Sequence, residues 1–62
     1  MKIQIKSITK LHAIIQDGKI KDYKQGLTIA VNEIYEGNKM NEHYSKLYGC
    51  DEVFIEGKII EK

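Results

Sequence analysis

The chain has 62 residues, of which 42% are hydrophobic and 31% are charged, and its formal net charge is +1. This composition argues against a disordered tail, and the length allows one small domain over residues 1–62. The single cysteine, Cys50, excludes an internal disulfide and the apolar runs are too short to span a bilayer, which together favour a cytoplasmic protein without a membrane segment.

The first expected element is a strand over residues 2–8, where isoleucines alternate with charged or polar residues. A hairpin is expected next, with strands over residues 11–16 and 19–23. Its turn is Asp17-Gly18, because an acidic residue followed by glycine tolerates the positive φ that a two-residue hairpin turn requires. These elements predict that the chain begins with antiparallel structure.

Residues 27–36 fit either a helix or a strand. Their apolar side chains fall at helical spacing and form one stripe, and two glycines bracket the segment, so a helix is the preferred interpretation. Their β-branched content favours a strand, and the segment is too short for periodicity to decide. Residues 41–48 are expected to form a second short helix, which Asn41 can cap and Gly49 can end.

The end of the chain predicts a second hairpin, with strands over residues 53–55 and 58–60. Glu56-Gly57 is the expected turn, so Gly57 is expected to have a positive φ. Glutamate is a weaker turn residue than aspartate, and a longer loop around the glycine is the alternative.

A short cassette of acidic residue, glycine and lysine recurs three times, at Asp17-Gly18-Lys19, Glu36-Gly37-Asn38-Lys39 and Glu56-Gly57-Lys58. Together these signals predict an α+β fold. Its small antiparallel sheet comprises an N-terminal strand and hairpin plus a C-terminal hairpin, and one or two short helices from residues 27–48 pack on one face. The alternative is an all-β triple hairpin in which the cassettes form a true internal repeat.

Residue types that support catalysis or metal binding cluster only at His43, Cys50 and Asp51. The spacing matches no zinc signature, and a structural zinc site needs four ligands. The five glycines are dispersed and form no phosphate-binding loop. We therefore expect no enzymatic activity, no cofactor and no metal.

Charge is distributed unevenly along the chain. Residues 1–26 hold six lysines and two aspartates, whereas residues 27–62 hold four lysines and seven acidic residues. The first part is therefore basic and the second acidic. The halves could attract each other within one fold, offer a basic face to an acidic partner, or pair between two chains.

Tyrosines and lysines are the candidate contact residues. Tyrosine is enriched at interfaces because it combines a large apolar ring with a polar tip. Tyr35 and Tyr48 are expected to be needed in the core, which leaves the other two tyrosines freer for contact. The candidate partner-binding residues are Tyr23, Tyr44, Lys6, Lys10, Lys19 and Lys21.

These features favour a non-enzymatic protein-interaction module or small regulator, because so short a chain has little room for both a core and an enclosed pocket. Abundant isoleucine and lysine without arginine are typical of AT-rich coding, so a bacterial or phage origin is expected. An open sheet edge and the complementary halves predict a homodimer. The alternative is a nucleic-acid-binding protein that uses the lysines of the N-terminal sheet face.

Overall fold

The first two strands form one long hairpin in the computed structural model, which describes residues 1–61. Strand β1 (Lys2–Gln16) pairs antiparallel with strand β2 (Lys19–Glu36), and the chain reverses at Asp17 and Gly18. The φ angles there are 54° and 74°, as a two-residue hairpin turn requires. The predicted first hairpin is confirmed, although its strands are much longer than expected.

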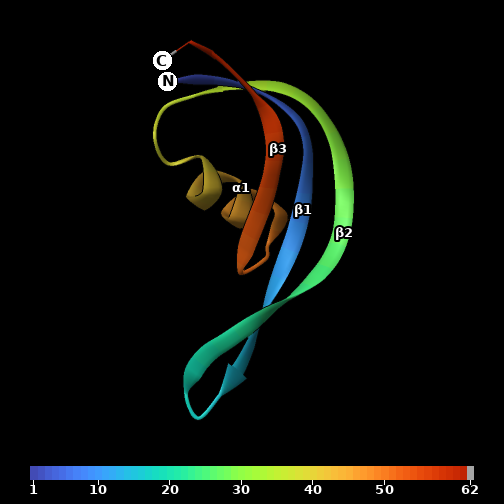
Figure 1. Ribbon diagram of the computed structural model, residues 1–62, viewed down its shortest axis with the longest axis vertical. Helices are drawn as coiled ribbons and strands as arrows, with labels where there is room; N and C mark the ends of the chain where they lie inside the picture. Colours follow the sequence, from blue (N-terminus) through green and yellow to red (C-terminus); the bar gives the residue numbers. More distant parts are fainter. Residues whose placement is uncertain (62) are drawn as a thin grey trace.

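Helix α1 (Met40–Tyr48) and strand β3 (Glu52–Glu61) complete the fold. The sheet order is β2-β1-β3, and both pairs are antiparallel. Figure 1 shows that the strands curve and that α1 lies on the concave side of the sheet. The helix ends at Gly49, as predicted, and this glycine takes the left-handed conformation (φ 66°). A mostly β-stranded α+β architecture is thus present, with one helix rather than two.

The core lies between the central strand and the helix. Ile5 and Ile8 of β1 are fully buried, and Val31, Tyr44 and Val53 pack around them from the other three elements. An odd spacing normally puts two strand residues on opposite faces. A register shift between Ile5 and Ser7 lets both isoleucines face the helix. Burying a side chain of this size contributes about 1.5–3 kcal/mol.

The expected helix over residues 27–36 is wrong, since this segment belongs to β2. Its residues pair with the first part of β1, for example Ile29 with Ile8 and Tyr35 with Ile3. Pairing with a distant strand outweighs a helical stripe that only a short segment supports. The predicted strand at 2–8 and the hairpin strand at 11–16 are likewise parts of one continuous strand, β1.

The expected C-terminal hairpin is also wrong, because residues 53–60 lie within the single strand β3. Gly57 stands opposite Ile5 inside the β1–β3 pair and does not have a positive φ. A Cβ atom on Gly57 would collide with the backbone carbonyl oxygen of Gln4. Close approach of two strands, rather than a turn, therefore requires this glycine. Of the three cassettes, only the first forms a hairpin turn.

A two-stranded arm extends beyond the body of the molecule. Strand β3 pairs with β1 only as far as Leu11, so residues 12–24 pair with nothing but each other. This segment, called the arm from here on, accounts for much of the 41 Å length of a molecule whose other dimensions are 21 and 17 Å. Figure 1 shows the arm projecting past α1 and β3, at the end opposite the N-terminus.

Replacement of Gly57 by alanine tests the close approach of β3 to β1. We expect a loss of about 1–3 kcal/mol in the free energy of unfolding, because the added methyl group must displace the backbone of Gln4. Urea denaturation measures the change. Lys58→Ala is the matched control, since Lys58 is the exposed next residue of the same strand. Equal stability of Gly57→Ala and the wild type would contradict this strand pairing.

Candidate functional site

The most distinctive surface of the molecule is the outer edge of β2. This strand pairs with β1 on one side only, and it is the longest strand in the structure at 18 residues. Residues 25–32 of it carry no charge and are rich in β-branched side chains. Unpaired N–H and C=O groups along such an edge are a template for another strand. This surface is called the β2 edge from here on.

The opposite side of the sheet is covered differently. The Asn41 side-chain amide of α1 donates a hydrogen bond of 3.1 Å to the carbonyl oxygen of Val53 on β3. Just before β3 begins, the Asp51 carboxylate accepts a hydrogen bond of 2.8 Å from the backbone N–H of Ala13 on β1. On that side of the sheet, side chains thus satisfy one backbone group of β3 and one of β1. Asn41 acts here rather than as the helix cap predicted for it, because Lys39 occupies the cap position.

Apolar side chains are exposed on the face of the sheet away from α1. Ile34 and Phe54 are 58% and 60% exposed. On the same face, the hydroxyls of Thr9 on β1 and Thr28 on β2 lie 2.9 Å apart and form a hydrogen bond. A shallow pocket here is lined by Ser7, Thr9, Leu11, Gln25, Thr28, Phe54 and Glu56. The surface next to the β2 edge is therefore partly apolar.

The arm adds further exposed apolar side chains. Ile15 is 67% exposed, and Ile14, Ile20 and Tyr23 are also exposed. An isolated two-stranded ribbon is marginally stable in water, so an arm of this kind gains from contact with another surface.

The lysines singled out from the sequence do not form one continuous patch. Lys19 and Lys21 lie at the tip of the arm, where they line a shallow hollow with Gln16 and Asp17. Lys6 is exposed at the register shift in β1. The amine of Lys10 lies 5.9 Å from the centre of the Tyr48 ring. Only the two lysines of the tip are brought together.

Of the two tyrosines proposed for contact, Tyr23 is exposed on the arm, whereas Tyr44 is buried in the core at 2% exposure. The Tyr44 hydroxyl donates to a Glu33 carboxylate oxygen at 3.0 Å. Burial, together with the hydrogen bond to the Glu33 carboxylate and the negative charge of that carboxylate, raises the pKa of Tyr44 from 10.0 to about 12. Tyr44 therefore joins α1 to β2 and does not face a partner.

The residues His43, Cys50 and Asp51 do not converge. The His43 ring packs edge-to-face against Tyr44 and tilted against Tyr35, with centroids 4.8 and 5.5 Å away. The Cys50 thiol donates to the carbonyl oxygen of Glu52 at 3.2 Å, while Asp51 binds the β1 backbone as described above. Across residues 1–61, no group of three or more metal-binding side chains comes together.

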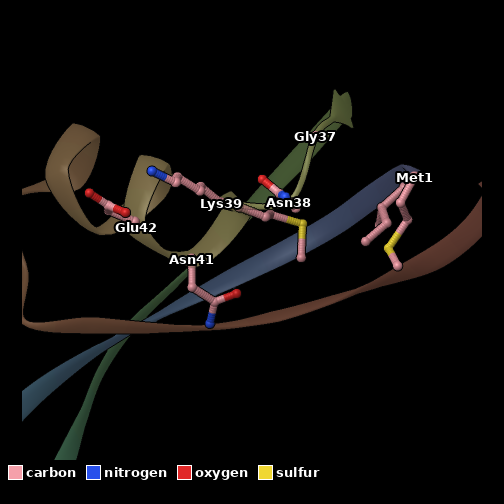
Figure 2. Close-up of a pocket in the computed structure, with 8 residues that line it drawn as sticks. Met1, Gly37, Asn38, Lys39, Asn41 and Glu42 are labelled. Carbon is pink, nitrogen blue, oxygen red and sulfur yellow. The ribbon is translucent and has the colours of Figure 1, made fainter.

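A second hollow lies where the loop after β2 enters α1. Its walls are Met1, Ile3 and residues 37–42. Figure 2 shows the Met1 side chain at one end, Asn41 below the helix, and Lys39 and Glu42 extending away from Met1. The lining is mainly apolar, and its charged side chains are Lys39 and Glu42. The Glu42 carboxylate accepts a hydrogen bond of 3.1 Å from the Lys46 amine.

Comparisons with protein-family models, with characterised proteins and with solved structures give no match to this chain. No helix of the described chain is long and apolar enough to cross a membrane. Its function is accordingly argued from its own surface.

Sequence reasoning missed the β2 edge because it assigned residues 27–36 to a helix. The signal that could have found it was the run of β-branched residues without a charge, which is typical of a strand. The pairing that leaves this strand at the outside of the sheet is a tertiary feature.

Replacement of Tyr44 by phenylalanine tests the link between α1 and β2. Loss of the hydrogen bond to Glu33 should cost about 0.5–1.5 kcal/mol at neutral pH. The raised pKa means that the native state keeps its proton when the unfolded chain loses it. The contribution of Tyr44 is therefore complete below pH 10.0 and is lost as the pH rises through about 12.

Unfolding free energies measured from pH 8 to pH 12 should thus fall less steeply in Tyr44→Phe than in the wild type. Tyr23→Phe is the control, because Tyr23 is exposed and its hydroxyl has no such partner in the described structure. Parallel pH profiles for the wild type and both variants would show that the Tyr44 hydroxyl has no stabilising role.

Proposed function

We propose that this protein is a non-enzymatic interaction module that binds another polypeptide as an added strand along the β2 edge. Main-chain hydrogen bonds would supply affinity, and side chains on either face of the edge would supply specificity. The observation that carries the proposal is the uncharged edge over residues 25–32.

Soluble proteins protect long edge strands with charges, proline or covering elements. On the other side of this sheet, the edge strand β3 carries charges at Glu56, Lys58 and Glu61, and Asn41 binds one of its carbonyl groups. The middle of β2 has neither charge nor proline, although Lys19, Lys21 and Lys24 stand near its beginning. An edge left open between charged ends favours a surface that is used for binding.

The surroundings of the edge fit the same role. Leu27 is 73% exposed at the point where β2 bulges outward opposite Lys10, and Ile34 is exposed further along. An incoming strand would place its own side chains beside these two and cover apolar surface on pairing. We place this binding in the cytoplasm of a bacterium or phage-infected cell, on the composition argued above.

The alternative function is nucleic-acid binding by the arm. Lys24 stands opposite His12, and Lys10 lies on the same face of β1 two residues before that histidine. Basic groups beside the exposed Tyr23 could follow a phosphate backbone. Asp17 and Asp22 interrupt this surface, so the proposal favours a protein partner.

Selection from a displayed library of random short peptides tests edge binding. We expect the wild-type protein to enrich extended peptides rich in β-branched residues. The double variant Leu27→Lys/Ala30→Lys should bind the enriched peptides at least about tenfold more weakly, because lysines along an edge oppose strand addition. Both residues are exposed in the structure, so the fold is expected to persist in circular dichroism spectra.

Phe54→Lys is the matched control, since it places a lysine on the same sheet but on β3. Its affinity for the peptides should stay near that of the wild type. Equal loss in the control would assign binding to the open face rather than to the edge. Binding of oligonucleotides that weakens steeply with salt, together with no enriched peptide, would favour the alternative function.

A further inference from the structure

The charges of β2 are arranged in three zones. Near its beginning lie three lysines, at positions 19, 21 and 24, and one aspartate, at position 22, so that this zone is net basic; glutamates at positions 33 and 36 lie near its end, and the zone between is uncharged. A strand that pairs antiparallel with its own copy about a two-fold axis brings its beginning against its end. The charge pattern of β2 is therefore complementary to itself in that orientation.

The two faces of β2 agree with such pairing, because residues directly opposite in an antiparallel pair share a face. Glu33 lies on the helix face, since its carboxylate accepts the hydrogen bond of Tyr44. Lys24 is on the same face. Lys10 of β1 faces the helix, because its amine lies by the Tyr48 ring. His12 is two residues further along β1 and therefore faces the same way, and Lys24 stands opposite His12. Lys24 of one copy can thus stand opposite Glu33 of another.

The bulge of β2 fixes the position of the two-fold axis. At this bulge, two residues of β2, Gly26 and Leu27, face the single residue Lys10 of β1. Strand β2 therefore has one extra residue at this point. Counted from Ile29, Glu33 is four positions ahead and Lys24 is five positions behind. β1 and β2 also lose register beside Lys6, where two residues of β2 face one residue of β1. That shift leaves the alternation of β2 intact, because Ile29, Val31 and Glu33 all lie on the helix face. Between Lys24 and Glu33, the extra residue at Gly26 and Leu27 is therefore the one that changes the face of β2, and an axis at Ile29 aligns Lys24 with Glu33.

The same register joins exposed apolar residues on the other face. One step beyond the Lys24–Glu33 pair, Tyr23 comes opposite Ile34. Both lie on the face away from the helix, opposite Ala13 and Gln4 of β1, and they are 40% and 58% exposed. An aromatic ring against a β-branched side chain is a favourable cross-strand pair.

We propose that the partner of the β2 edge is a second copy of this chain, bound antiparallel about a two-fold axis at Ile29, with Lys24 opposite Glu33 and Tyr23 opposite Ile34. The two three-stranded sheets become one continuous sheet in the order β3-β1-β2-β2-β1-β3. This inference rests on the proposed function, because it names the occupant of the same edge. Every contact occurs twice, and the body of each copy lies beside the base of the other copy's arm.

Sedimentation equilibrium of charge-reversed variants tests the register. The wild-type protein is expected to dimerise, and Lys24→Glu should weaken the dimer at least about tenfold, because the like charge opposite Glu33 occurs twice. The double variant Lys24→Glu/Glu33→Lys restores opposite charges in both pairs and should dimerise more tightly than Lys24→Glu, and Glu33→Lys alone separates this effect from loss of the Tyr44 hydrogen bond. Lys19→Glu is the matched control, since it makes the same change beyond the paired length and should leave the dimer nearly unchanged.

Disulfide crosslinking between two copies tests the proposed register directly. In a Cys50→Ser background, the variant Tyr23→Cys/Ile34→Cys should form a covalent dimer under mild oxidation, and neither single cysteine variant should do so. The two positions lie far apart along one strand, so they cannot close a bridge within one chain. Circular dichroism of each variant confirms that it remains folded.

The outcomes separate the two proposals. A wild-type protein that stays monomeric at high micromolar concentration but binds displayed peptides along the edge would overturn self-pairing and leave the proposed function standing. A monomer that binds no peptide would overturn both. A dimer that Lys24→Glu and Lys19→Glu weaken equally, or that forms no Tyr23→Cys/Ile34→Cys crosslink, would overturn the proposed register.

Discussion

Of the three strands in the described chain, β1 alone has a partner on both sides, and the burial of Ile5 and Ile8 on it sets the position of the other elements. Ile5 and Ile8 must both face α1, and the register shift between Ile5 and Ser7 makes that possible. The shift changes the pairing on both sides of β1. On the β3 side, the strands approach so closely opposite Ile5 that only glycine fits, at Gly57.

One small core supports a sheet that is longer than the core itself. The helix and β3 cover β1 only up to Leu11, and the arm continues without them. Tyr44 extends the core sideways, because its buried ring packs with Ile5 and Ile8 while its hydroxyl binds Glu33 on β2. That contact links α1 to β2, although the helix lies nearest to β3. The outer side of β2 is uncovered because β2 is an edge strand in the order β2-β1-β3.

Edge binding and self-pairing use the same property of β2. Unpaired backbone groups provide affinity for any extended chain, whereas the positions of Lys24 and Glu33 select one register and one orientation. The bulge at Gly26 and Leu27 is needed for both residues to fall on the same face and at matching distance from Ile29. A feature that looks like an irregularity of the hairpin therefore gives the edge its specificity.

The sequence by itself determined the features that depend on neighbouring residues. Asp17-Gly18 specified the hairpin turn because positive φ is a local property, and residues 41–48 with Gly49 specified the helix and its end. The difference in charge between residues 1–26 and residues 27–62 was also readable. Tertiary structure decided what residues 27–36 and Gly57 do, because their state depends on pairing with the distant strand β1. Burial of Tyr44 and exposure of the β2 edge follow from that pairing, which no local pattern encodes.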